Sequence, residues 1–148
     1  MPRSLHDAAT RDDLRARLSR LSPDSPRAWG KMTADQMLWH CNMLLESALG
    51  RGEHAPMRVP LPNFLLKFII LNLPWPKGSP THPDYVAGDR YDFEAERTRC
   101  VTLIDEFAGR PLEATTWGRS PGFGEATGAE WSRLQARHLD HHLRQFST

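Results

Sequence analysis

The chain has few cysteines and no surplus of charge of either sign. Cys41 and Cys100 are the two cysteines among 148 residues, and they form neither a CxxC pair nor a short disulfide framework. This usage is typical of a reduced, cytoplasmic protein. The 19 basic and 18 acidic residues give a formal net charge of +1, whereas surfaces that bind nucleic acids are strongly basic. The sequence therefore predicts a cytoplasmic location and no nucleic-acid partner.

Long apolar segments are also missing. Residues 64–73, FLLKFIILNL, form the one strongly apolar stretch, but it contains Lys67 and covers about half of the roughly 20 residues that a transmembrane helix needs. We expect a short buried helix there, with contact to a membrane surface as the less favoured alternative. The first residues, MPRSLHDAATRDDLRARL, lack the apolar core of a secretory signal. The sequence thus predicts neither a signal peptide nor a membrane partner.

Four segments have the periodicity of amphipathic helices, and no segment alternates as a half-buried strand does. They cover about residues 10–21, 33–49, 92–108 and 127 to the end. The second and fourth begin with TADQ and TGAE, in which the Thr hydroxyl and the Gln or Glu side chain can cap free backbone amides. Because the length is typical of one domain, the sequence predicts a single all-α domain over residues 1–148.

The second and third predicted helices are joined by a long connection, residues 50–91. It contains the apolar stretch and seven prolines, which are Pro56, Pro60, Pro62, Pro74, Pro76, Pro80 and Pro83. A connection of this length within a compact domain usually covers a site or crosses from one end of a helical bundle to the other.

Three histidines of the last predicted helix lie in HLDHHLRQF, residues 138–146. On a helical wheel His138 and His142 fall in the middle of the apolar arc, near Trp131, whereas His141 points to the flank. The spacing of four residues places the two inward imidazoles one turn apart, near enough to bind one ion. For this pair alone, ordinary buried histidines with hydrogen-bond partners are an equally good interpretation.

The second predicted helix supplies a third inward histidine. His40, in MLWHC, lies at the edge of an apolar arc and so faces the interior or the rim of the bundle. Three inward histidines from two helices are the ligand set of a catalytic zinc-type site with an open position. The remaining histidines, His6, His54 and His82, fall in the tail or in loops, where we expect them to be solvated. Cys41 is expected to be a buried structural thiol.

Three stretches give the chain a family resemblance. They are WGKMTADQMLWHC, PWPKGSPTHP and FGEATGAEWSRLQARHLDHHLRQF. Over about residues 29–146 the sequence resembles the DinB-like (DinB/YfiT) superfamily, in a branch ending in HxxHHLRQF. The resemblance implies an up-and-down four-helix bundle of the superfamily's variant hand, with the long connection between helices 2 and 3. It also implies that His40, His138 and His142 bind a divalent metal ion, with zinc or nickel favoured.

The resemblance bears on function as well. The superfamily contains transferases and isomerases that use low-molecular-weight thiols such as bacillithiol, mycothiol or glutathione, and this implies a small-molecule substrate and a thiol partner. The chain has no separate thiol-binding motif. We therefore expect a metal-dependent enzyme, either a thiol-dependent S-transferase or a hydrolase acting on a small molecule. The alternative is a non-catalytic bundle that binds a small ligand or a protein, with a structural metal ion or none.

Other polar and aromatic residues complete the expectations. No carboxylate is identified as a general base, because Asp35, Glu46 and Asp140 map away from the inferred site. Gln145, about one turn beyond the last ligand, is expected either beside the ligands or in an outward hydrogen bond. Trp39 lies on the polar face of its helix, which favours a contact surface and with it a homodimer formed by helix packing. The alternative is a tryptophan covered by the long connection.

Overall fold

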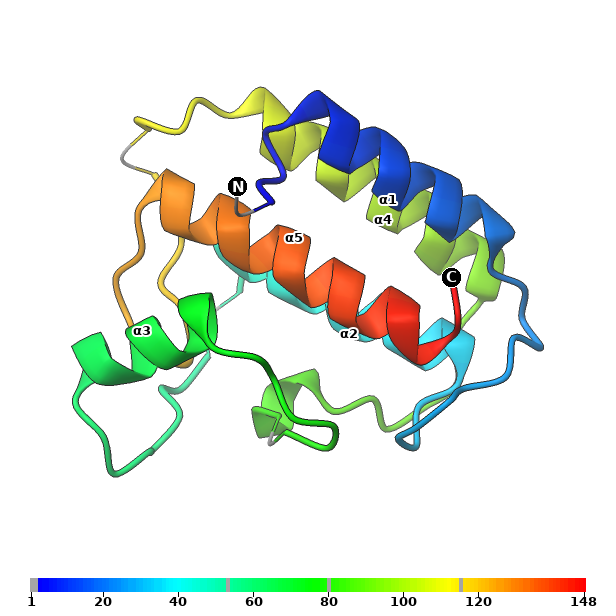
Figure 1. Cartoon of the computed structure of the whole chain (residues 1–148), viewed down its shortest axis with the longest axis horizontal. Helices are drawn as coiled ribbons and strands as arrows, with labels where there is room; N and C mark the ends of the chain where they lie inside the picture. The colour runs from blue at the N-terminus through cyan, green and yellow to red at the C-terminus, as the bar shows by residue number, and fades with distance from the viewer. Residues whose placement is uncertain (1–2, 53, 80, 115) are drawn as a thin grey trace.

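The computed structural model describes residues 3–52, 54–79, 81–114 and 116–148, and within these ranges the regular structure is helical. The four long helices are α1 (Ala8–Arg20), α2 (Ala34–Ala48), α4 (Phe93–Gly109) and α5 (Gly128–Gln145). They run up and down as a bundle in which α1 and α2 each pack on both α4 and α5 (Figure 1). The predicted all-α, up-and-down four-helix bundle is confirmed.

Side-chain caps set where the helices begin. The Asp7 carboxylate accepts a hydrogen bond from the Thr10 amide at 2.9 Å, so α1 begins earlier than predicted. At the start of α5, the Glu130 amide donates to the Thr127 hydroxyl and the Thr127 amide donates to the Glu130 carboxylate. This is the reciprocal cap predicted from TGAE. The bounds of α2 and α4 lie within one residue of the predicted ones.

The core lies between the four long helices. Its fully buried side chains include Trp131 on α5, Phe107 on α4 and Leu45 on α2. The Trp131 indole also donates to the Gly118 carbonyl oxygen at 2.8 Å, which satisfies the one polar atom of a buried ring. Cys41 is buried with a free thiol, as predicted, and burial raises its pKa well above the usual value.

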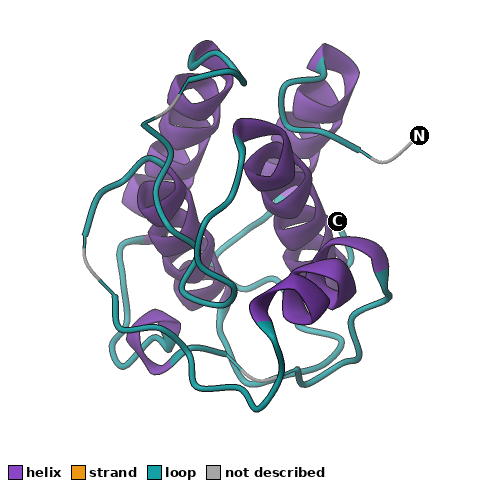
Figure 2. Ribbon diagram, turned by 90° about the vertical axis from the view of Figure 1, so that its left-hand side faces the viewer, coloured by secondary structure: helices purple, strands orange, loops and turns teal. Residues whose placement is uncertain are grey.

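The long connection leaves the bundle after α2 and forms α3 (Asn63–Asn72) and the short 3-10 helix η1 (Pro83–Tyr85) before α4 begins. Figure 2 shows these two shorter elements beside one end of the bundle, where α3 packs on α5 and η1 packs on α2. Pro80, in the same connection, lies outside the described residues.

The apolar stretch 64–73 is a helix, but the expectation that it is buried is wrong. Of the residues of α3, Leu71 alone is buried, whereas Phe64 and Phe68 are 76% and 56% exposed. Among the described helices, α3 packs on α5 alone. Although α3 is apolar on nearly every side, only one of its faces is covered. Within the described residues, no helix combines the length and the apolar character that crossing a membrane requires.

Candidate metal centre

His40 on α2 meets His138 and His142 on α5 in the interior of the bundle. All three residues are buried, and each offers a ligand nitrogen within 4.8 Å of those of the other two. The Nε2 atoms of His40 and His138 are 2.9 Å apart. The ring centroid of His142 lies 4.7 Å from that of His40 and 4.6 Å from that of His138. The fold thus brings together the three histidines that the sequence predicted as metal ligands.

A backbone carbonyl from the long connection orients His40. Its Nδ1 lies 2.8 Å from the carbonyl oxygen of Tyr85, in η1. A carbonyl oxygen can only accept, so Nδ1 carries the proton and Nε2 presents its lone pair to the other two histidines. The Tyr85 hydroxyl is 2.6 Å from the Ser47 hydroxyl on α2, which holds η1 against that helix. The sequence did not predict a role for Tyr85. The one sequence feature that pointed toward it was the long connection, which was expected to cover a site.

An amide side chain orients His142 in the same way. Its Nδ1 lies 3.0 Å from Gln145 Oε1, and the Gln145 amide nitrogen donates to the Trp29 carbonyl oxygen at 2.8 Å. The second bond fixes which end of the amide faces the imidazole, so Oε1 accepts the Nδ1 proton. The Nε2 lone pair of His142 is then free for a ligand bond. Of the two expectations for Gln145, the position beside the ligands is the one observed.

His138 lacks such a partner. Its Nδ1 is buried and has no hydrogen-bond partner among the described residues. Its Nε2 faces the His40 lone pair at 2.9 Å and donates to it in this arrangement. Leaving a buried polar atom unpaired costs about 1–3 kcal/mol. The cluster is therefore not a self-satisfied set of core histidines.

Burial keeps the three imidazoles neutral. It lowers the pKa of His138 well below the usual value, and the neighbouring His142 and His40 lower it further. Burial and the nearby His40 lower the pKa of His142 to about 3. Burial also lowers the pKa of His40, against the opposing effect of its bond to Tyr85. Neutral imidazole is the form that binds a metal ion.

The three nitrogens lie close enough together to be compatible with a metal site. Metal–nitrogen bonds of about 2.0–2.1 Å place two ligand atoms roughly 3.4 Å apart in a tetrahedron. Two of the ligand nitrogens are 2.9 Å apart, and all three lie within 4.8 Å of one another. Imidazole suits zinc, copper, iron and nickel. Three protein ligands also leave one coordination position for a water or a substrate, as in catalytic zinc sites.

Two tryptophans from separate loops border the cluster beside His141. The His141 ring lies 5.8 Å from the Trp29 ring and 5.5 Å from the Trp75 ring, and Trp75 is also 6.2 Å from His138. The Lys77 ammonium lies 4.8 Å from the centroid of Trp29. Sequence reasoning did not single out these tryptophans, although both stand in the motifs WGK and PWP that carry the family resemblance.

The remaining histidines stay outside the cluster, but the expectation that they are solvated is wrong. His82 is buried, and its ring bonds to a backbone carbonyl oxygen. His6 is half-buried and lies 2.8 Å from the Ser132 hydroxyl. His54 is half-buried and lies 3.1 Å from the Asp84 carboxylate. Each of these rings holds a loop or the amino-terminal segment in place through its ring nitrogens. The spacing of histidines along the sequence does not predict such a role.

Trp39 is covered by the long connection. Its ring stacks on that of Tyr91, with centroids 5.1 Å apart and planes 5° from parallel. Trp39 is thus partly covered, which agrees with the alternative to a contact surface; the homodimer remains a prediction.

Comparison with known proteins agrees with this geometry. A model of the DinB superfamily matches residues 6–146, nearly the whole chain. Searches of curated proteins and of solved structures gave no match. On the match to the family model, the chain belongs to the DinB superfamily.

Proposed function

We propose that the protein is a metal-dependent enzyme in which His40, His138 and His142 hold a divalent ion, zinc or nickel. The observation that carries the proposal is the direction of the lone pairs. The Tyr85 carbonyl oxygen and Gln145 Oε1 each accept a hydrogen bond from the Nδ1 of a histidine, so the Nε2 atoms of His40 and His142 each have a lone pair to offer a ligand, and the Nε2 of His40 faces that of His138. Such outer hydrogen bonds are the usual companions of metal-binding histidines. Membership of the DinB superfamily supports the same conclusion.

A divalent ion held by His40, His138 and His142 would lower the pKa of a bound water or thiol, and so would supply a nucleophile at neutral pH. The Tyr85 carbonyl oxygen and Gln145 Oε1 fix the tautomers of His40 and His142. Burial of the three histidines keeps bulk water away from the ligand nitrogens. Carboxylates are engaged elsewhere, since Asp35 binds Arg90 and Asp140 binds Arg17. We therefore assign no general base.

The substrate we propose is a small electrophile, with a low-molecular-weight thiol as the second reactant. Trp29 and Trp75 provide apolar surface beside the cluster, with Lys77 over the first ring and Arg137 over the second. The alternative reaction is hydrolysis of a small molecule. Cys41 and Cys100 are both free and buried, which fits a cytoplasmic, reducing environment. A non-catalytic binding bundle is the rival function, and the support that Trp39 gave it is weakened because that ring stacks on Tyr91.

The test uses protein purified without a histidine tag and loaded with zinc or with nickel. Turnover of an aryl halide is measured with glutathione, bacillithiol and mycothiol in turn, and ester hydrolysis is measured without thiol. We expect metal-dependent turnover in at least one arm, lost in His138→Ala and retained in His54→Ala, whose histidine lies outside the cluster. A loaded protein inactive in every arm would overturn the enzyme proposal and favour the binding bundle.

A further inference from the structure

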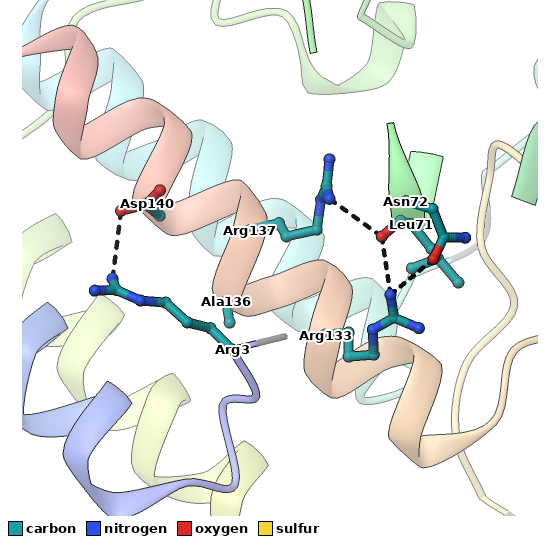
Figure 3. A pocket seen from close by; sticks show the side chains of 7 residues that line it. All are labelled: Arg3, Leu71, Asn72, Arg133, Ala136, Arg137 and Asp140. Atoms are coloured by element: carbon teal, nitrogen blue, oxygen red, sulfur yellow. Dashed lines mark hydrogen bonds and ion pairs between the residues drawn. The ribbon is translucent and has the colours of Figure 1, made fainter. Parts of the chain in front are cut away.

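A second site lies on the opposite side of α5 from the metal centre. A cavity of about 250 Å³ opens between α5, the end of α3 and the amino-terminal segment. Figure 3 shows the residues that line it, which are Arg3, Leu71, Asn72, Arg133, Ala136, Arg137 and Asp140. Three are arginines and one is an acid.

The surroundings of the cavity carry a surplus of positive charge. Asp140 is shared among three arginines, since its carboxylate lies 2.7 Å from Arg17, 2.9 Å from Arg144 and 3.5 Å from Arg3. Asp13 is the other acid within reach, and it pairs with two of the same arginines. The described residues provide no ion pair for Arg133 or Arg137. The positive charge of five arginines is therefore offset by only two carboxylates, those of Asp13 and Asp140. The arginines are Arg3, Arg17, Arg133, Arg137 and Arg144.

The contacts that Arg133 and Arg137 do make leave much of their charge unbalanced. Both donate to the carbonyl oxygen of Leu71 at 3.1 Å, at the end of α3. Arg133 also donates to the Asn72 side-chain oxygen at 3.0 Å, and Arg137 also donates to the Leu73 carbonyl oxygen and lies over the Trp75 ring, 5.2 Å from its centroid. None of these partners carries a full negative charge. A helix carboxyl end carries only about half a negative charge, so it offsets a fraction of two guanidinium groups. The Nε atoms of both arginines are buried without a hydrogen-bond partner. Burial, followed by the charge of Arg133, lowers the pKa of Arg137.

We propose that this cavity binds a phosphate group, either as free phosphate or as the monoester of a small metabolite. Arg3, Arg133 and Arg137 line the cavity from two segments of the chain, with the Arg3 guanidinium beside Asp140 and the other two beside Leu71 (Figure 3). Guanidinium groups match phosphate oxygens in charge and in geometry. A dianion offsets the surplus charge better than a single carboxylate does. The volume suits a small ligand, because sites for drug-sized molecules begin at about 300 Å³.

Titration calorimetry in a chloride buffer measures the binding of inorganic phosphate and, in a separate titration, of glycerol phosphate. We expect saturable binding at one site, weakened about tenfold or more in Arg133→Gln and in Arg137→Gln, because each loses charge-assisted hydrogen bonds. Tighter binding of glycerol phosphate than of inorganic phosphate identifies a monoester as the ligand, and the reverse identifies free phosphate. Arg119→Gln, an arginine far from the cavity, is the matched control and should bind as the wild type does.

Two further variants keep the result interpretable. Arg3→Gln removes a cavity charge without touching α3, so a weaker affinity there does not depend on the folding of the α3–α5 contact. His142→Ala removes a predicted metal ligand and should leave phosphate binding unchanged, which separates this site from the metal centre. The proposal is overturned if wild-type protein shows no saturable binding at millimolar phosphate, if acetate binds as tightly as phosphate, or if the three cavity variants match the wild type.

Discussion

Gln145 Oε1 lies 3.0 Å from His142 Nδ1, and this contact fixes which nitrogen of the imidazole is available as a ligand. Gln145 is in turn held by its bond to the Trp29 carbonyl. A Cβ atom at Gly30, which has a φ of +84°, would come within 2.2 Å of the Gln145 amide nitrogen. The loop before α2 therefore has to carry glycine there for the amide to reach its position.

We expect Gln145→Leu to weaken metal binding about 10- to 100-fold, the usual cost of removing a hydrogen bond to a metal-binding histidine. Competition with a chromogenic chelator measures the affinity. Gln145→Glu keeps an oxygen acceptor for Nδ1 and should retain more affinity than the leucine variant. If Gln145→Leu binds zinc as tightly as the wild type, Gln145 does not set the tautomer.

An ion pair between the buried Asp35 and the exposed Arg90, at the start of α2, makes stability depend on pH. Asp35 is 2% exposed and accepts hydrogen bonds from Arg90 at 3.0 Å and from the Tyr91 amide at 2.8 Å. Burial acts to raise the pKa of this carboxyl, but the bonds from Arg90 and Tyr91 outweigh it and hold the pKa below its usual range. The folded-state pKa is thus lower than the unfolded value of about 3.9. The stabilisation is fully present above the unfolded value, and it is lost as the pH falls from there through the lower folded-state pKa.

Asp35→Asn should therefore lower the free energy of unfolding by about 2 kcal/mol at neutral pH. The difference from the wild type should shrink as the pH falls below about 4. Urea denaturation at several pH values measures both effects. Asp12→Asn, at an exposed surface pair, is the control and should cost less than about 1 kcal/mol. A difference between Asp35→Asn and wild type that stays constant down to acid pH would contradict the account.

Gly118 allows the segment before α5 to lie against the end of α2. Its amide donates to the Ala48 carbonyl oxygen at 2.8 Å, and a Cβ atom there would meet the Ser47 carbonyl oxygen at 1.8 Å. Gly118→Ala should destabilise the fold by about 3 kcal/mol, the upper end of the cost of overpacking. Thermal and urea unfolding give the value. Gly88→Ala, where an added Cβ meets nothing within 4 Å, should be close to neutral. Equal stability of the two variants would show that this close approach is absent.

The two sides of α3 should respond differently to truncation. Leu71 is 4% exposed and Phe64 is 76% exposed. We expect Leu71→Ala to cost about 2–5 kcal/mol and Phe64→Ala to change stability by about 0.5 kcal/mol or less. Urea denaturation of both variants measures the contrast. A large loss of stability in Phe64→Ala would mean that its ring is covered in solution.

The sequence predicted the bundle because helical periodicity and capping residues are local signals. It predicted His40, His138 and His142 because each lies on or beside an apolar helical face. It could not predict Tyr85, which orients His40 through a backbone carbonyl that any residue type possesses. Nor could it predict that Phe64 is exposed, because α3 is apolar on nearly every side and periodicity then does not identify the buried face.

The central claim is tested most directly by metal content, measured by plasma mass spectrometry on protein purified without a histidine tag, incubated with zinc or nickel, and dialysed. We predict about one ion per chain in the wild type, and a loss of that ion in His40→Ala, His138→Ala and His142→Ala. His54→Ala should retain it. Wild-type protein that keeps no ion, or cluster variants that keep as much as the wild type, would contradict the three-histidine metal centre.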